Sequence, residues 1–132
     1  MTSRNVDLNA AANDGRRMLR RTAELADVVE FLEEVRLRPG MWVRGGSLEH
    51  LESMLVGYRV ALDVHGIAEE FDFWPGGRFT EWLCAKLGRH SSLSWSARIE
   101  REAAAAGLNP MDVFFNFLDE YLDDRRKSGS RD

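Results

Sequence analysis

The stretch Val35–Gly66 reads VRLRPGMWVRGGSLEHLESMLVGYRVALDVHG and contains the clearest helix signal of the chain. From Leu48 onward its apolar residues recur at steps of three and four, which places them on one face of an α-helix. Ser47 stands at an N-cap position, and Gly66 stands where a left-handed residue ends a helix. Glu52 falls on the polar side. We therefore predict a helix over residues 48–65 whose buried face comprises Leu48, Leu51, Leu55, Tyr58, Leu62 and His65.

The residues just before this helix predict an irregular connection. Pro39 disfavours helical geometry at the residue before it, so an upstream helix is expected to end there. Glycines at positions 40, 45 and 46 widen the backbone conformations that the segment can adopt. We expect Trp42 to be held in a glycine-rich turn between two helices.

The other patterns of the chain are also helical. Asp27 and Glu30 have the spacing of a capping box, and Asn109 followed by Pro110 marks the start of the last helix. Residues 67–77 contain too short an alternation for a strand, so we expect an aromatic loop there. The prediction is an all-α fold, a single compact bundle of five to six helices in which helix 48–65 packs against the helices near 27–37 and 110–124. The expected organisation is a flexible N-terminal segment 1–14, a helical domain 15–126 and a flexible C-terminal tail 127–132.

Composition is typical of one soluble domain. The 132 residues are 44% hydrophobic and 30% charged, and the longest apolar runs fall far short of a membrane span. The N-terminal residues lack the apolar block of a secretory signal, and Cys84 is the single cysteine, so no disulfide can form within one chain. These features predict a cytoplasmic protein.

Charge is distributed unevenly along the chain. Residues 1–21 carry a net charge of +3, whereas residues 22–132 carry −7. An acidic body repels nucleic acid and favours basic protein partners, although the same acidity also keeps a protein soluble. The basic run could contact a nucleic-acid backbone, or it could be a solvated helix face. Its five arginines are Arg4, Arg16, Arg17, Arg20 and Arg21.

No residue pattern predicts catalysis, a metal or a cofactor. His50 and His65 lie fifteen residues apart, about four helical turns, which is too far for them to share an ion. His90 is separate from both. Cys84 has no histidine within a turn, and a buried inert thiol is the expected role. No nucleophile–base pair or carboxylate dyad has recognisable spacing, so we expect a protein that is not an enzyme.

The string VRLRPGMWV, residues 35–43, resembles the VRKRPGMYIG run near the start of the ATPase domain of DNA gyrase B subunits. In those enzymes the nucleotide site also needs a helix with Glu and Asn, then a DxGxG motif and a glycine-rich lid. The helix that follows here has no Asn, and no DxGxG follows it. A motif carries its function only in its structural context, so this local match does not predict an ATP site.

A longer resemblance covers about residues 30–122. The segments RPGMW, SLEHLESMLVGY, GRFTEWL, SLSWSARIE and FFNFLDEYL resemble the pattern of a group of small bacterial helical proteins that carry RPGMY or RPGMW. That group includes immunity proteins encoded beside polymorphic toxins. The resemblance implies a non-enzymatic, immunity-type inhibitor that masks the surface of a cognate toxin. None of these motifs is catalytic, and none assigns a toxin-binding residue.

Two segments have the composition of a protein-binding surface. Trp42 and Trp74 lie in glycine-rich segments, and each could either fill the core or anchor a partner. Charged neighbours could steer the approach of that partner. The alternative is that Phe71, Phe73 and Trp74 all turn inward and leave those charges as ordinary solvated groups. The second segment is the acidic side of the last helix. The candidate partner-binding residues are Trp42, Arg44, Glu69, Glu70, Asp72, Trp74, Arg78, Asp119, Glu120, Asp123 and Asp124.

The functional prediction is therefore a cytoplasmic protein-binding protein, most simply an immunity-type inhibitor of a basic toxin domain. The alternative is a small regulatory or adaptor domain that contacts nucleic acid through its basic N-terminal arm. The sequence disfavours nucleic acid and membranes as partners and leaves the oligomeric state open.

Overall fold

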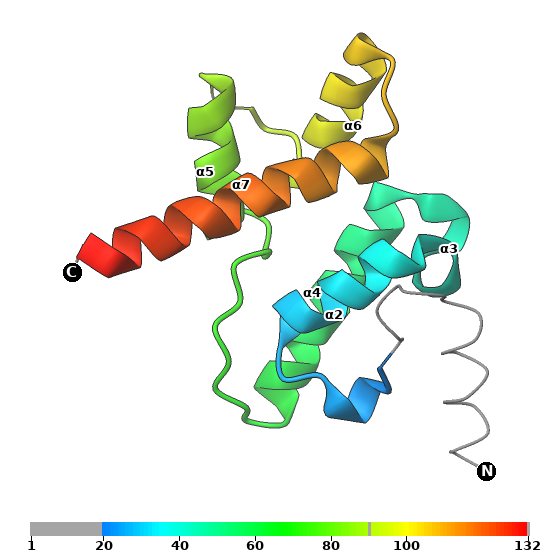
Figure 1. Ribbon diagram of the computed structural model, residues 1–132, viewed down its shortest axis with the longest axis vertical. Helices are drawn as coiled ribbons and strands as arrows, with labels where there is room; N and C mark the ends of the chain where they lie inside the picture. Colours follow the sequence, from blue (N-terminus) through cyan, green and yellow to red (C-terminus); the bar gives the residue numbers. More distant parts are fainter. Residues whose placement is uncertain (1–19, 90, 132) are drawn as a thin grey trace. The chain divides into compact units, whose positions relative to one another are not determined.

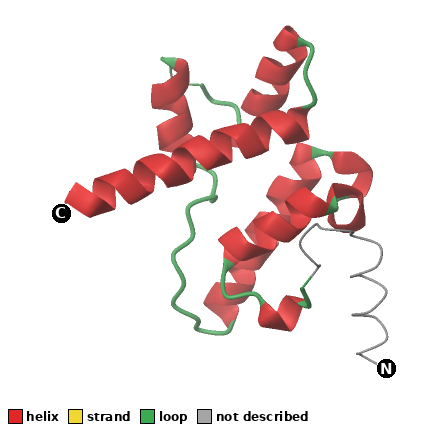
Figure 2. Ribbon diagram, in the orientation of Figure 1, coloured by secondary structure: helices red, strands yellow, loops and turns green. Residues whose placement is uncertain are grey.

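The computed structural model describes residues 20–89 and 91–131, and every regular element in them is a helix (Figure 2). The predicted all-α class is confirmed. The predicted flexible segment 1–14, three of the five arginines and His90 lie outside the described residues. The chain forms two compact units, Met1–Trp42 and Val43–Asp132. Their boundary falls inside residues 35–66, the stretch with the clearest helix signal. Each unit is described by itself.

The described part of the first unit consists of short helical elements. It contains a 3₁₀ turn, η1 (Thr22–Glu24), and two helices, α2 (Val28–Leu37) and α3 (Pro39–Trp42). Asp27 caps α2 by accepting a hydrogen bond from the Glu30 backbone N–H at 3.0 Å, which is the N-cap half of the predicted capping box. The Glu30 carboxylate accepts from the Ala26 backbone N–H at 3.1 Å. Arg38 leaves helical geometry with φ −140° and ψ 67°, which Pro39 requires of its predecessor.

The prediction that Trp42 lies in an irregular turn is wrong, because Trp42 lies in a short helix. Pro39 does not only end α2; it also opens α3, a single helical turn that includes Trp42. Proline suits the first helical position because its missing N–H would have no intrahelical partner there. The left-handed backbone occurs later, at Gly45 and Gly46, with φ values of 63° and 65°.

The described residues of the second unit, 43–89 and 91–131, form one 3₁₀ turn and four α-helices. Three of the helices are capped by a side chain: Ser47 for α4 and Asn109 for α7, as predicted, and Ser94 for α6, which was not among the predicted caps. α7 extends further than the sequence predicted, because residues 127–131 continue the helix. The elements are η2 (Arg44–Gly46), α4 (Leu48–Val64), α5 (Arg78–Leu87), α6 (Trp95–Ala106) and α7 (Pro110–Arg131).

The buried face of α4 follows the predicted pattern with two corrections. Leu48, Leu51, Leu55 and Leu62 are buried, whereas Tyr58 is half-buried. His65 was predicted on this face and is exposed, because α4 ends at Val64 and the chain turns away. Glu52 was predicted on the polar side, yet it is half-buried and accepts a 2.6 Å hydrogen bond from the Ser96 hydroxyl of α6.

An aromatic cluster fills the space where α5, α6 and α7 contact one another. Phe79 of α5 is fully buried at its centre. Its ring lies 5.7 Å from Trp95, 5.9 Å from Phe114 and 5.3 Å from Tyr121, all edge-on. The edge-on geometry brings the positive edge of one ring to the negative face of the next, which adds to the hydrophobic gain from burial. The cluster therefore holds α5, α6 and α7 together.

Candidate protein-binding surface

The segment Ile67–Gly77 connects α4 to α5 without regular structure, as predicted, and runs back along α4 (Figure 1). Two contacts tie its first half to that helix. Tyr58 stacks on Phe71 with ring centroids 5.9 Å apart, and the Tyr58 hydroxyl donates to the Glu69 carboxylate at 2.9 Å. We call residues 67–77 the aromatic loop. Its backbone is fixed by side chains of the neighbouring helix.

The middle of the aromatic loop is buried and bound to α7. Asp72 was predicted to be an exposed steering charge, and that prediction is wrong, because its side chain is only 6% exposed. Its Oδ2 accepts hydrogen bonds from the Tyr121 hydroxyl and from Arg125 Nη1, each at 2.6 Å. A buried carboxylate needs such partners to offset its lost hydration. Arg125 also donates to Glu70 at 2.9 Å, so both carboxylates serve to anchor the loop.

Arg125→Ala is expected to destabilise the protein by about 2 kcal/mol. Of the two hydrogen bonds that the buried Asp72 carboxylate accepts from α7, only the one from the Tyr121 hydroxyl remains in this variant. The value lies at the low end for a stranded charge since Arg125 is 37% exposed and water can enter its place. Arg126→Ala is the matched control: Arg126 is 76% exposed and should cost less than about 0.5 kcal/mol. Chemical denaturation measures both variants. Equal losses would show that the ion pair does not hold the loop.

Tyr121 gives the fold a dependence on alkaline pH. Burial raises the pKa of the Tyr121 phenol above its ordinary value, and its hydrogen bond to Asp72 raises it further. An unfolded tyrosine ionises near pH 10, so above about pH 10 the unfolded chain holds fewer protons than the folded one and stability falls as pH rises. Below that pH this contribution is constant. We expect the Tyr121→Phe variant to lose less stability than the wild type between about pH 10 and pH 11.5, as measured by urea denaturation at each pH.

Trp74 differs from the other aromatic residues of the loop. Phe73 is buried and Phe71 is half-buried, whereas Trp74 is 40% exposed. The guanidinium of Arg59 lies 5.5 Å from the Trp74 ring, a cation–π contact to the side of α4. The alternative in which all three aromatic residues turn inward is therefore correct for Phe71 and Phe73 and wrong for Trp74. Phe71 and Phe73 turn inward, and Trp74 stays at the surface.

The acidic side of α7 is largely occupied by partners from its own chain. Glu120 pairs with Lys86 at 2.8 Å, and Asp124 accepts a 2.8 Å hydrogen bond from Trp82 Nε1. Asp123 pairs with Lys127 and Arg126 one turn further along the helix. Asp119 is exposed. Exposed pairs of this kind contribute little stability and can exchange for a partner's charges, so the side remains acidic but is no preformed pocket.

The other candidate residues lie in separate places. Arg44 and Arg78 are exposed, in η2 and at the first position of α5. Trp42 belongs to the first unit, where it is half-buried and packs edge-on against Phe31 at 5.4 Å. Its Nε1 is buried without a hydrogen-bond partner among the described residues. Trp42 is thus part of the packing of its own unit, as one of the two alternatives held.

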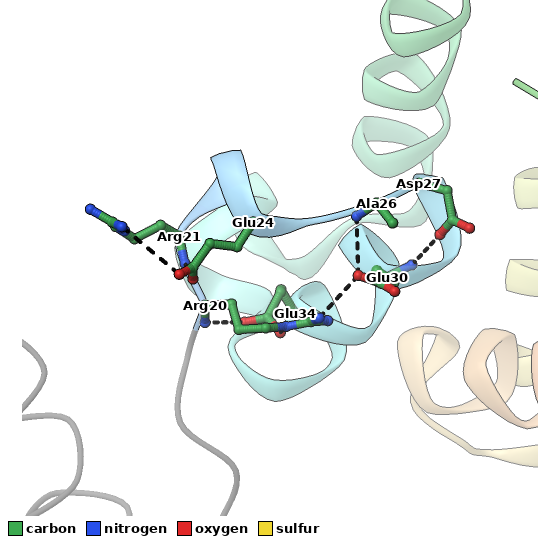
Figure 3. Close-up of polar contacts among 7 residues, drawn as sticks. All are labelled: Arg20, Arg21, Glu24, Ala26, Asp27, Glu30 and Glu34. Carbon is green, nitrogen blue, oxygen red and sulfur yellow. Dashed lines mark hydrogen bonds and ion pairs between the residues drawn. The ribbon is translucent and has the colours of Figure 1, made fainter. Parts of the chain in front are cut away.

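The described arginines of the basic run are bound to carboxylates of their own unit (Figure 3). Arg20 donates through Nη1 to Glu30 at 3.0 Å, and through its backbone N–H to the buried Glu34 at 3.1 Å. Arg21 pairs with Glu24 at 3.8 Å. Arg4, Arg16 and Arg17 lie outside the described residues. Carboxylates beside two of the five arginines weaken the attraction to phosphates on which the nucleic-acid alternative depends.

Cys84 is buried as predicted, and its neighbour is Arg98, which sequence reasoning missed. Arg98 is 4% exposed and its Nη1 lies 3.3 Å from the Cys84 sulfur. Its Nη2 has no hydrogen-bond partner among the described residues. Within residues 20–89 and 91–131, no three His, Cys, Asp or Glu side chains gather closely enough to hold a metal ion. None of the helices in that part of the chain is both long and apolar enough to cross a bilayer.

Sequence reasoning also missed the residues that position the aromatic loop. Tyr121 and Arg125 lie about fifty residues after Asp72, and no local pattern signals a contact over that distance. Arg59 was detectable only as a polar residue beside Tyr58 on the central helix. Comparisons of the chain with protein-family models, with curated proteins and with solved structures find no match.

Proposed function

We propose that this protein is a non-enzymatic binding protein, an immunity-type inhibitor that neutralises a bacterial toxin domain by covering its surface. The observation that supports this proposal best is Trp74. Its large aromatic side chain is 40% exposed in the second half of the aromatic loop, whose residues Glu69 and Asp72 are bound to α4 and α7. Tryptophan is enriched among residues that dominate binding energy, and a fixed loop spends little entropy on association. The resemblance of residues 30–122 to immunity proteins motivates the choice of partner class.

The charge of the chain supports a basic partner. The net charge is −4, and two of the acidic residues that contribute to it, Asp119 and Glu120, are exposed on α7. An acidic surface speeds the approach of a basic protein without fixing the affinity, which depends on buried anchors. A basic toxin domain that acts inside the producing cell fits these properties. The inhibitor itself needs no catalytic group.

The test uses the polypeptide encoded beside this gene in its source genome. Co-expression should relieve the growth arrest that this polypeptide causes, and the two purified proteins should form a complex in calorimetry. No complex and no relief of growth arrest would contradict the proposed function.

Trp74→Ala should weaken this complex by about 30-fold, which corresponds to about 2 kcal/mol. The same variant should keep the wild-type melting temperature within a few degrees, because the ring is two-fifths exposed and its contact with Arg59 is worth about 1 kcal/mol or less. Trp82→Ala is the control, since Trp82 packs against Phe79 and Tyr121: it should lower the melting temperature and leave affinity for the partner unchanged. If Trp74→Ala melts far lower and binds normally, Trp74 belongs to the core.

A further inference from the structure

The helix α4 has a second apolar face, opposite the leucines that it buries. Met54, Gly57, Ala61 and Val64 recur at steps of three and four, and Val60 lies beside them. Met54 is 36%, Val60 48% and Val64 73% exposed, and Gly57 and Ala61 are exposed as well. We call these five residues the outer face of α4. A surface helix normally carries polar residues there, so this face needs an explanation.

Gly57 stands at the centre of the outer face, and the fold does not require it. A Cβ built on Gly57 would have no heavy atom within 4 Å, and no left-handed backbone is recorded at this position. A glycine inside a helix destabilises that helix relative to an alanine. Gly57 therefore leaves open space on the outer face. A bare backbone at a helix crossing lets a second helix approach more closely than side chains allow.

One flank of the outer face is acidic at both ends. Glu49, Ser53, Val56, Val60 and Asp63 follow one another at steps of three and four, so Glu49 and Asp63 begin and end the same line. Both are exposed, and the exposed pair of Asp63 with Arg59 at 3.3 Å is weak enough to exchange. Fourteen residues of helix separate the two carboxylates by about 21 Å. A second copy of α4 packed antiparallel would bring like charges together on this flank.

We propose that the outer face of α4 is a docking surface for an amphipathic helix of a partner protein, with an apolar stripe and two basic residues about fourteen positions apart. The stripe covers Met54, Val60 and Val64, and its closest point lies over Gly57. The basic residues pair with Glu49 and Asp63. This inference rests on the proposed function only in that the partner is a protein; it adds the surface and the chemistry of the docking segment.

The experiment measures binding of two designed helical peptides to the full-length protein by fluorescence anisotropy. Both peptides carry a Leu/Ala stripe; one has Lys and the other Glu at the two positions fourteen residues apart. The Lys peptide should bind at least tenfold more tightly than the Glu peptide. A Glu49→Gln/Asp63→Asn variant should lose that preference, because the preference depends on the two carboxylates.

Gly57→Leu is the decisive variant. The added side chain enters open space and improves helix propensity, so the protein should melt at or above the wild-type temperature while binding of the Lys peptide falls at least tenfold. Gly129→Leu is its match, because Gly129 lies in α7 with equally open space: this variant should also melt at or above the wild-type temperature, but it should bind the Lys peptide as the wild type does. Equal binding of both peptides, full binding by Gly57→Leu, or an equal loss in Gly129→Leu would each overturn the proposal.

A strand-forming peptide of the same charge that binds more tightly than the helical one would also overturn it. Because the probe is a peptide, these outcomes do not depend on the toxin. If the peptides bind as stated but the polypeptide encoded beside this gene does not, the proposed inhibitor function is contradicted, whereas the proposed docking surface on α4 is supported.

Discussion

Phe79→Ala is expected to lower the free energy of unfolding by about 3–5 kcal/mol, a large share of the stability of a domain of this size. The Phe79 ring is fully buried and contacts aromatic rings from the aromatic loop, α5, α6 and α7. Its removal leaves a cavity that the surrounding rings can fill only by leaving their present packing positions. Urea denaturation followed by tryptophan fluorescence measures the loss.

Phe117→Ala removes the same number of atoms from α7 and serves as the control. Phe117 is half-buried and touches Trp82 with ring centroids 6.2 Å apart. Its loss should therefore cost about half as much or less, since part of the site is already open to water. If the two variants unfold at the same urea concentration, the cluster is not organised around Phe79.

Features with a local cause were predictable from the sequence. Ser47, Ser94 and Asn109 lie three residues before the backbone N–H groups that they cap, and Gly88 and Gly107 end their helices with left-handed backbone. Each of these signals spans only a few residues. The all-α class follows from their repetition along the chain, together with apolar spacing of three and four.

The predictions from sequence were wrong at residues whose burial is decided by tertiary contacts and not by the composition of the surrounding segment. Asp72 has the neighbours of an exposed charge in the sequence, yet Tyr121 and Arg125 draw it into the interior. Glu52 lies off the leucine face of α4, yet Ser96 of α6 reaches it. Polar residues can be buried wherever a distant partner supplies hydrogen bonds, and a single sequence does not show which distant residue that is. Trp74 has no such partner drawing it fully inward and stays 40% exposed at the surface, where composition placed it.

The predicted leucine face of α4 can be tested within one helix. Leu55→Ala should destabilise the protein by about 2–5 kcal/mol, because Leu55 has no exposed surface and its truncation leaves a cavity. The neighbouring Met54→Ala should cost less than about 1 kcal/mol, since Met54 is 36% exposed on the opposite, outer face. Thermal and urea denaturation compare the two variants directly.

The contrast between Leu55 and Met54 also separates folding from binding on the same helix. Leu55→Ala should weaken docking of the Lys peptide only through the fraction of molecules that unfold, whereas Met54→Ala should weaken docking of a fully folded protein. If Met54→Ala lowers the free energy of unfolding as much as Leu55→Ala does, the outer face is already covered by the protein itself. In that case α4 would have two buried sides, and Gly57 would have to be explained by internal packing instead of by a partner.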